Sequence, residues 1–475
     1  MIPRLSLSRL WLVLAVLLPV LGSLATPLST VDLAYHVRVG EQILDTGRIP
    51  AVDDLTFTAA GQPWLDQQWL AQLVLGSIHR LGSWEALAVL RAVLVGVVFG
   101  LLILACRISG ASNRIAAGLG LAAFVAAVAT LALRPQLIGM ALFAVTLAIL
   151  AARRDRPQLL WLLPFIAAVW TNVHGSFVLA PLAVGVAMLG DLRAREASGR
   201  RIVLVAAATL AATLVSPFGL GTWTYAAGLT TNPLVTGRIT EWQPTSLRSF
   251  SGIVFFASAL LLAAYLARRP GRTPWLTLAW LGGLFVLGAY AERGVAWWPL
   301  GAAVVAAGLI AEDRRAAAEP ALHERPPNRV NGLIAMALVA VAVLLLPWWR
   351  TADPVVGRRG LLLDAPALAT AVRATSIPGD RLFVPQRWGS WFEWATPDRP
   401  VFVDSRVELF PVAVWDDATA VTVGLEDWVG VLDRWSIDVV VVDTATGGDL
   451  QSRMEAQPGW REAASDAEGT VFVRR

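Results

Sequence analysis

The sequence predicts a mainly α-helical, polytopic membrane protein: a transmembrane bundle of about eleven helices followed by a small α/β domain. Three observations predict this fold class. The chain of 475 residues is 56% hydrophobic and 16% charged, and its mean hydropathy is +0.60. Apolar runs long enough to cross about 30 Å as helices recur up to Trp349. After Trp349 these runs stop, and short strand-like runs alternate with helical patterns.

Charge and cysteine content narrow the class further. All 39 basic residues are arginines, the formal net charge is +4, and the sequence pI is about 9.9. Such a pI would suggest nucleic acid in a soluble protein, but in a membrane protein basic residues mark cytoplasmic loops. We therefore expect no nucleic-acid partner. The single cysteine, Cys106, lies in an apolar run, which excludes a disulfide framework and a cysteine metal site.

The apolar runs define the predicted spans. They lie at about 10–27, 84–106, 114–133, 135–152, 158–173, 175–190, 202–218, 250–267, 274–290, 295–311 and 331–349. We therefore predict a transmembrane domain over residues 1–349 and a second domain over residues 350–475.

The connections between the runs alternate in charge, which predicts the orientation. One set is rich in arginine and should be cytoplasmic by the positive-inside rule: Arg4, Arg9, Arg107, Arg114, Arg153, Arg154, Arg156, Arg193, Arg195, Arg200, Arg201, Arg268, Arg269, Arg272, Arg314, Arg315, Arg325 and Arg329. The alternate set comprises residues 31–83, 171–175, 217–249, the turns at 134 and 292–293, and everything after 349. We expect a bacterial plasma-membrane protein with its N-terminus inside and its C-terminal domain outside.

The first apolar segment has a second interpretation. A basic start, an apolar core and small residues near Ala25 are also typical of a signal peptide. Its removal would leave the rest of the predicted topology unchanged.

The first outer loop, residues 28–83, predicts two amphipathic helices on the membrane surface. Residues 32–45 have apolar positions at helical spacing, and the following Gly47 and Pro50 predict the end of that helix. A second helix is predicted over Asp66–Arg80, with an aspartate-bearing turn between the two.

The tail predicts a small α/β domain outside the membrane. Strand-like runs lie at 382–384, 401–403, 438–442 and 471–473, with helical patterns at 362–375 and 425–435. Its tryptophans form a core, face the membrane or line a sugar site: Trp388, Trp391, Trp394, Trp415, Trp428 and Trp435.

Polar residues on the outer side are the candidates for chemistry. Asp32 and His36 are four residues apart and therefore face the same way on a helix. That geometry suits a general base and a neighbour that orients it or contacts an anion, although a solvated pair has the same spacing. Asp53, in the same loop, is a second candidate carboxylate.

The remaining candidates lie at outer helix ends. Arg134 sits in LALRPQL between two spans, where it either snorkels or clamps a phosphate with its planar fork. His174, in WTNVHGSF, is either a structural hydrogen-bonding residue or a ligand. Arg293 either pairs with Glu292 or contacts substrate, and Glu241 either contacts substrate or caps a helix. No HExxH, DxD or histidine cluster appears, so no metal ligands are assigned; a divalent metal at the outer aspartates is a weaker alternative.

These motifs resemble a bacterial branch of the GT-C glycosyltransferase superfamily, which includes protein mannosyltransferases and lipid A aminoarabinose transferases. The resemblance covers most of the chain. In the first outer loop it rests on Asp32 and His36, on Gly40 to Pro50, on Asp53 before an aromatic Ser/Thr stretch, and on Trp64 with Trp69-Leu70. Elsewhere it rests on RPQL at Arg134, NVHGSF at 172–177, SPFG at Ser216, ITEWQP at Ile239, the ERG turn and VFVDSR at 401–406.

The resemblance implies a lipid-linked sugar donor, usually a polyprenyl phosphate sugar, used on the outer face of the membrane. It implies an acidic general base in the first outer loop, which by position is Asp32. Arg134, His174 and Arg293 are then the candidates to hold the phosphate as it leaves. The chain departs from the pattern at Gln67-Gln68, where the branch often has His-Glu, and at Leu33, where other members have a second acid.

The acceptor is a hydroxyl on an unassigned glycan, lipid or protein. A non-catalytic protein is the competing interpretation: a lipid or polysaccharide transporter, or a scaffold that presents the outer domain. A transporter more usually shows internal repeats and charged or Gly/Pro-broken mid-span positions. We find no repeat, and the polar residues gather at outer helix ends.

Overall fold

The structure, a computed structural model, describes residues 3–28, 30–196, 199–269, 271–317, 326–349, 361 and 366–475. The predicted cytoplasmic Arg325, the start of the predicted domain at 350 and the first residues of the predicted helix 362–375 lie outside these ranges. The chain forms two compact units. Unit 1 comprises Met1–Thr26, Ala88–Ala227 and Ile239–Trp349, and unit 2 comprises Pro27–Leu87, Gly228–Arg238 and Arg350–Arg475.

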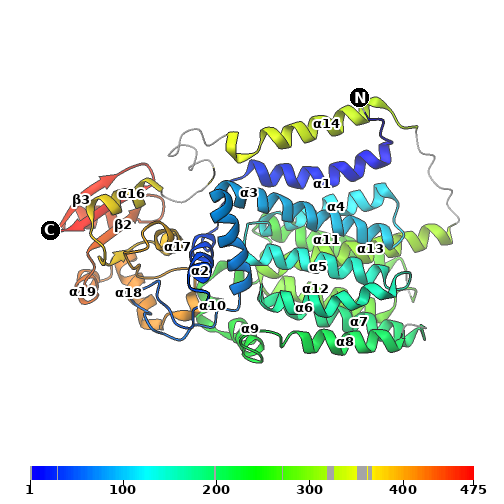
Figure 1. The fold of residues 1–475 in the computed structure, drawn as a ribbon, viewed down its shortest axis with the longest axis horizontal. Helices are drawn as coiled ribbons and strands as arrows, with labels where there is room; N and C mark the ends of the chain where they lie inside the picture. Colours follow the sequence, from blue (N-terminus) through cyan, green and yellow to red (C-terminus); the bar gives the residue numbers. More distant parts are fainter. Residues whose placement is uncertain are drawn as a thin grey trace. The chain divides into compact units, whose positions relative to one another are not determined.

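Unit 1 is a bundle of helices that run side by side in Figure 1. Each of the eleven predicted apolar runs overlaps a helix. Its helices are α1 (Leu7–Ala25), the second part of α3 (Trp69–Ile108), α4 (Asn113–Ala127), α5 (Pro135–Ala152), α6 (Leu162–Thr171), α7 (Leu179–Arg193), α8 (Gly199–Ala212), the first part of α9 (Gly221–Thr231), α11 (Phe250–Ala267), α12 (Trp275–Tyr290), α13 (Trp297–Ala316) and α14 (Arg329–Leu344). Short 3-10 turns link several of them: η1 (Val128–Thr130), η2 (Pro157–Trp161), η3 (Gly175–Val178), η4 (Thr240–Trp242), η5 (Glu292–Ala296) and η6 (Pro347–Trp349).

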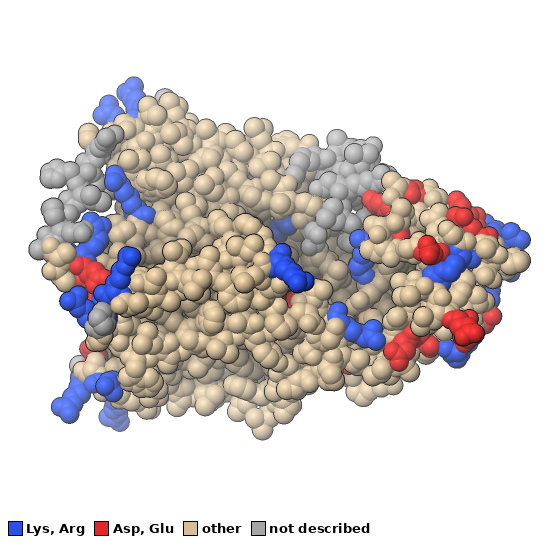
Figure 2. All heavy atoms as spheres, turned by 180° about the vertical axis from the view of Figure 1, so that it is seen from behind, with Lys and Arg blue, Asp and Glu red and all other residues tan. Residues whose placement is uncertain are grey.

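The helices of unit 1 have the length and composition of membrane spans. Among the described residues, seven are long and apolar enough to cross a bilayer, and three shorter apolar helices accompany them, at Pro157–Thr171, Trp275–Tyr290 and Arg329–Leu344. On the face shown in Figure 2, the flank of this unit is nearly free of charged side chains, and arginines gather at one end. The protein is therefore a multi-pass membrane protein, and the count of eleven spans stays a prediction.

The second predicted surface helix and the following span are joined in one element. Helix α3 covers 40 residues, but Gly82 and Ser83 have non-helical backbone angles and divide it into two helices. Ser83 has a φ of 57°, which a non-glycine residue rarely adopts. The two predicted helices therefore exist, separated by a kink rather than by a loop.

Unit 2 combines the first outer loop with the tail. Its helices are α2 (Leu33–Thr46), the first part of α3, α10 (Pro233–Arg238), α16 (Pro366–Thr375), α17 (Gln386–Ala395), α18 (Val412–Val423), α19 (Trp428–Arg434) and α20 (Leu450–Glu455). Its strands are β1 (Leu382–Phe383), β2 (Val439–Asp443), β3 (Trp460–Ser465) and β4 (Gly469–Arg474), and the turn η7 (Val407–Leu409) precedes α18. The sheet order is β1-β2-β4-β3, with β1 parallel to β2 and the other pairs antiparallel.

The core of unit 2 explains most of the tail tryptophans. Strand β2 is buried along its whole length, and Trp388, Trp391, Trp415 and Trp428 are buried. Of the three interpretations of these tryptophans, the structure assigns these four to the core.

Helix α2 is the element that the loop sequence predicted. It begins after Asp32 and ends at Gly47, whose φ of 66° is the left-handed cap that glycine adopts readily. Its apolar face packs on the following loop through Tyr35, Val39 and Ile43, which form a buried cluster with Leu55 and Trp64. Helix α2 thereby fixes the position of Asp32 at its start.

Candidate functional site

The seven predicted site residues divide between the units. Asp32, His36 and Asp53 belong to unit 2, and Arg134, His174, Glu241 and Arg293 belong to unit 1. Each group is described by itself.

In unit 1, the predicted residues occupy helix starts and short turns. Arg134 immediately precedes α5, whose first residue is Pro135, a residue favoured at that position because its fixed φ suits a helix. His174 precedes η3, and Arg293 lies in η5 between α12 and α13. Glu241 lies in η4. The Gln136 amide donates to the Arg293 carbonyl at 3.0 Å and ties the start of α5 to η5.

These four side chains come together with Trp242. Arg134 donates to Glu241 in an ion pair. The guanidinium of Arg293 lies 4.6 Å from the centroid of the Trp242 ring, a cation–π contact. Its Nη2 lies 3.3 Å from His174 Nε2. We call this set the arginine–histidine cluster: Arg134, His174, Glu241, Trp242 and Arg293.

His174 is held in one orientation by its neighbours. Its Nδ1 lies 2.8 Å from the Ser176 hydroxyl, and that hydroxyl accepts from the Trp170 indole N–H at 3.1 Å. The backbone N–H of Ser176 donates to the same Nδ1 at 3.2 Å, so His174 caps the start of η3. The two arginines and Glu241 leave the cluster with a net positive charge.

Unit 2 places Asp32 at the first turn of α2. The structure assigns no hydrogen bond from its side chain to the α2 backbone; it accepts instead from the Thr30 hydroxyl. The other carboxylate oxygen lies 3.9 Å from Nε2 of His36, which is 1% exposed against 20% for Asp32. The predicted (i, i+4) pair is therefore present, with its histidine buried and its carboxylate still accessible to solvent.

Two residues without an assigned role complete this group. Gln72, in the first part of α3, places its amide nitrogen 2.9 Å from Asp66 Oδ1 and 3.3 Å from His36 Nδ1. We call Asp32, His36, Gln72 and Asp66 the Asp32 chain. Burial raises the pKa of the Asp66 carboxyl to about 7, although Arg406 and the Gln72 hydrogen bond act in the opposite direction.

The raised pKa of Asp66 predicts that Asp66→Asn stabilises the folded protein by an amount that depends on pH. The folded state holds its proton up to about pH 7, whereas the unfolded chain releases it near the ordinary value of 3.8. Because the folded state binds more protons in that interval, stability falls as pH rises through it and stays low above it. The free energy of unfolding of Asp66→Asn should therefore exceed that of wild type by up to about 4 kcal/mol at pH 8, and by little at pH 4.

Thermal unfolding in detergent at pH 4 to 8 measures this gain. Asp54→Asn is the matched control, because Asp54 is an exposed carboxylate of the same loop, and surface substitutions usually change stability by less than about 0.5 kcal/mol. A gap between Asp66→Asn and wild type that does not widen with pH contradicts the prediction.

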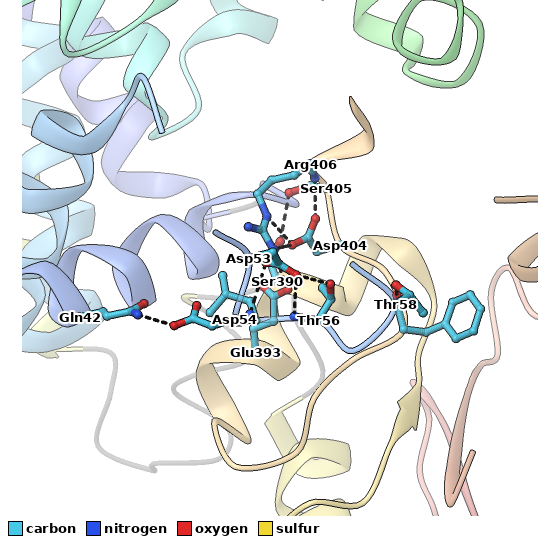
Figure 3. A network of polar contacts seen from close by, with 12 residues as sticks. Gln42, Asp53, Asp54, Thr56, Thr58, Ser390, Glu393, Asp404, Ser405 and Arg406 are labelled. Carbon is cyan, nitrogen blue, oxygen red and sulfur yellow. Dashed lines mark hydrogen bonds and ion pairs between the residues drawn. The ribbon is translucent and has the colours of Figure 1, made fainter. Parts of the chain in front are cut away.

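Asp53 lies in a buried ion-pair network rather than at an open surface (Figure 3). Its carboxylate accepts from the backbone N–H groups of Leu55 and Thr56 at 3.3 and 3.2 Å, which shapes the turn after Val52. Nη2 of Arg406 lies 2.7 Å from Asp53 Oδ1. The oxygens of Asp53 thus already accept from these groups within the protein. Its role in substrate binding stays a prediction.

Arg406 is the centre of that network. Its Nε donates to Asp404 at 2.6 Å, and Glu393 lies 3.9 Å from Nη2. Burial and then the neighbouring Asp404 raise the pKa of Glu393 well above its usual range. The guanidinium also lies 4.5 Å from the centroid of the Trp64 ring. We call Asp53, Glu393, Asp404 and Arg406 the Arg406 network; it joins the first outer loop to the tail within unit 2.

Sequence reasoning did not assign Gln72, Ser176, Trp242 or the network around Arg406. Signals for three of them were present, because Ser176 belongs to NVHGSF, Trp242 to ITEWQP and Arg406 to VFVDSR. Gln72 carries no motif. Among the described residues, no group of three or more His, Cys, Asp or Glu side chains could hold a metal ion.

No protein-family model matches the sequence, and a search of curated proteins finds no match. Solved structures do match in fold. The archaeal oligosaccharyltransferase AglB from Archaeoglobus fulgidus, in complex with an inhibitory peptide and a dolichol-phosphate, gives a TM-score of 0.61 at 12% identity; the match covers 98% of this chain and 74% of AglB.

Structures of two further proteins are similar over nearly the whole of this chain. ArnT from Cupriavidus metallidurans in the apo state gives a TM-score of 0.54 at 16% identity and covers 97% of both chains. An ArnT structure bound to undecaprenyl phosphate gives 0.53. The mycobacterial arabinofuranosyltransferase AftD gives 0.57 at 18% identity and covers 100% of this chain and 40% of AftD. The chain therefore has the fold of the GT-C glycosyltransferases.

Proposed function

We propose that the protein is a membrane glycosyltransferase that moves a sugar from a polyprenyl phosphate donor to an acceptor hydroxyl. The reaction takes place on the outer face of the bacterial plasma membrane, with the N-terminus in the cytoplasm. The observation that carries this proposal is the arginine–histidine cluster, which gathers two arginines at helix ends of a GT-C fold.

The arginine–histidine cluster suits a lipid phosphate. The Arg134–Glu241 pair is partly exposed, with 18% and 37% of the two side chains accessible. Such a pair contributes about 0–1 kcal/mol, so an entering phosphate can replace Glu241 at little cost. Arg293 is held by Trp242 and His174, and its fork matches phosphate oxygens. Both cations stabilise the charge that develops as the phosphate leaves.

Asp32 acts as the general base. Its carboxylate takes the proton of the acceptor hydroxyl while that oxygen attacks the anomeric carbon of the donor. The bond between the anomeric carbon and the phosphate oxygen breaks, and polyprenyl phosphate leaves as an anion. The bound dolichol-phosphate and undecaprenyl phosphate in the AglB and ArnT structures support a donor of this class.

Reconstitution tests the function. The purified protein in nanodiscs is incubated with a panel of polyprenyl phosphate sugars and with membrane extracts as acceptors. The proposal predicts release of polyprenyl phosphate and a new glycoside for at least one donor. Consumption of none of them by folded protein would favour the competing non-catalytic class, a transporter or a scaffold.

Arg293→Gln is expected to weaken the binding of polyprenyl phosphate by about 10- to 100-fold, because it removes a hydrogen bond between two charged groups. Binding of a fluorescent polyprenyl phosphate in nanodiscs measures the change. Arg248→Gln is the matched control, since Arg248 is an exposed arginine between η4 and α11. Equal affinities of the two variants would remove Arg293 from the phosphate site.

A further inference from the structure

Gln72 places its side-chain amide between Asp66 and His36. The Gln72 side chain is completely buried, and its amide nitrogen faces both Asp66 Oδ1 at 2.9 Å and His36 Nδ1 at 3.3 Å. An amide nitrogen only donates, so His36 Nδ1 must accept. The proton of the neutral imidazole then lies on Nε2, the nitrogen that is 3.9 Å from Asp32 Oδ2.

Asp66 selects this orientation of the Gln72 amide. The reversed amide would point its oxygen at a carboxylate oxygen of Asp66, and two acceptors repel each other. Because Oδ1 of Asp66 accepts from the Gln72 amide, it keeps the NH₂ group between itself and His36. The charged and titratable groups around the Asp32 chain are Arg406 beside Asp66, Asp32 itself, and Tyr35, whose ring centroid lies 4.1 Å from that of His36 with the two rings tilted by 37°.

The backbone fixes the partners at these positions. Helices α2 and α3 approach so closely at two glycines that a Cβ on Gly40 would lie 1.9 Å from the Gln72 carbonyl oxygen. A Cβ on Gly76 would lie 2.6 Å from the Gly40 carbonyl carbon. Only glycine permits this contact. It brings Gln72 against the turn of α2 that carries His36.

We propose that Gln72 and Asp66 are positioning residues that hold His36 as its Nε2–H tautomer, so that His36 presents a donor to the Asp32 carboxylate. At 3.9 Å the Nε2–H is beyond direct hydrogen-bond distance, but its positive end faces the carboxylate, and Thr30 donates to the other carboxylate oxygen. The tautomer itself is a property of the fold. Its effect on sugar transfer rests on the proposed role of Asp32 as general base.

Nitrogen-15 NMR of the histidine rings tests the tautomer without any activity assay. The chain has four histidines, so the solid-state spectrum of histidine-labelled protein in lipid is simple, and His36→Gln identifies the His36 signals. Wild type should show a neutral ring protonated at Nε2. A ring protonated at Nδ1 in wild type overturns the proposal.

Two Gln72 variants sharpen the test. Gln72→Glu keeps the shape but sets a carboxyl oxygen against Nδ1, so the proton should move to Nδ1. Gln72→Leu removes the donor, so a mixture of tautomers should appear. Gln42→Leu is the matched control, because Gln42 lies on α2 and pairs with the exposed Asp54 at 2.6 Å; its His36 spectrum should equal wild type. Unchanged Nε2–H in both Gln72 variants overturns the proposal.

The transfer assay then separates the two proposals. Gln72→Leu should lower kcat about tenfold, the effect of one lost hydrogen bond to the reacting group's partner, while KM stays unchanged. If wild type transfers no sugar but has the Nε2–H tautomer, the proposed function fails and the positioning of His36 stands. If wild type transfers sugar and the tautomer is insensitive to Gln72, the positioning proposal fails alone.

Discussion

Asp32→Asn is expected to lower the rate of sugar transfer by about 10²- to 10⁴-fold, the range that a positioned general base contributes. The amide cannot take the acceptor proton, yet it keeps the shape of the carboxylate and can still accept from Thr30. The loss should fall on kcat, because the donor phosphate is assigned to other residues. Initial rates of polyprenyl phosphate release by wild type and variant measure it.

Asp45→Asn is the control for this substitution. Asp45 lies near the other end of α2, is 67% exposed, and pairs with Arg80 at 2.6 Å. Its replacement removes a carboxylate from the same helix and should leave the rate unchanged. Equal rates for Asp32→Asn and Asp45→Asn would exclude Asp32 as the base, whatever the donor.

Arg406→Met is expected to have the largest effect on stability, about 3–5 kcal/mol, because breaking a buried pair leaves the remaining charges without compensation. The arginine side chain is 2% exposed and faces Asp53, Asp404 and Glu393, each with a fully buried side chain. Methionine fills a similar volume but leaves these carboxyl groups without a cation. Thermal unfolding followed by tryptophan fluorescence measures the loss.

Arg434→Met provides the comparison for the Arg406 network. Arg434 pairs with Asp417 and Asp427, but its side chain is 52% exposed, so its loss should cost about 0–1 kcal/mol. Adding Asp53→Asn to Arg406→Met should cost less than the sum of the single changes, since the amide removes one uncompensated charge. A loss for Arg406→Met no larger than that for Arg434→Met would contradict the network's role in holding the loop and the tail together.

The sequence predicted the fold correctly where one strong pattern, such as a long apolar run, determines the structure. Apolar runs of spanning length and the alternation of arginines predicted the helices of unit 1, because lipid requires continuous apolar segments. The amphipathic helix α2 was predicted with its glycine cap. The break at Gly82 and Ser83 falls in the gap between the predicted helix Asp66–Arg80 and the predicted span 84–106, but its form, a kink without a loop, was not predicted.

The tail was predicted less completely. The buried strands β2 and β4 were recognised from their valine-rich runs. Strand β3 was missed because WREAAS has no β-branched residue and no alternation of apolar and polar positions, and only its pairing with β4 makes it a strand. Helix α17 was missed because its apolar positions are tryptophans and a phenylalanine separated by Gly, Ser and Glu, which is a weak helical pattern.

The site illustrates the same limit. Sorting polar residues by side of the membrane selected Arg134, Glu241, His174 and Arg293 before their contacts were known. It could not pair Arg134 with Glu241, which are 107 positions apart, or Asp53 with Arg406, which are 353 apart. Such contacts depend on tertiary packing, for which one sequence carries no periodic signal.

Donor binding and donor turnover, measured on the same nanodisc preparations of wild type and Asp32→Asn, test the central claim most directly. A labelled polyprenyl phosphate sugar reports both quantities. We expect wild type and variant to bind the donor with the same affinity, and only wild type to release polyprenyl phosphate and form a glycoside. Equal turnover by both proteins, or folded wild type that binds no donor of this class, would contradict the account.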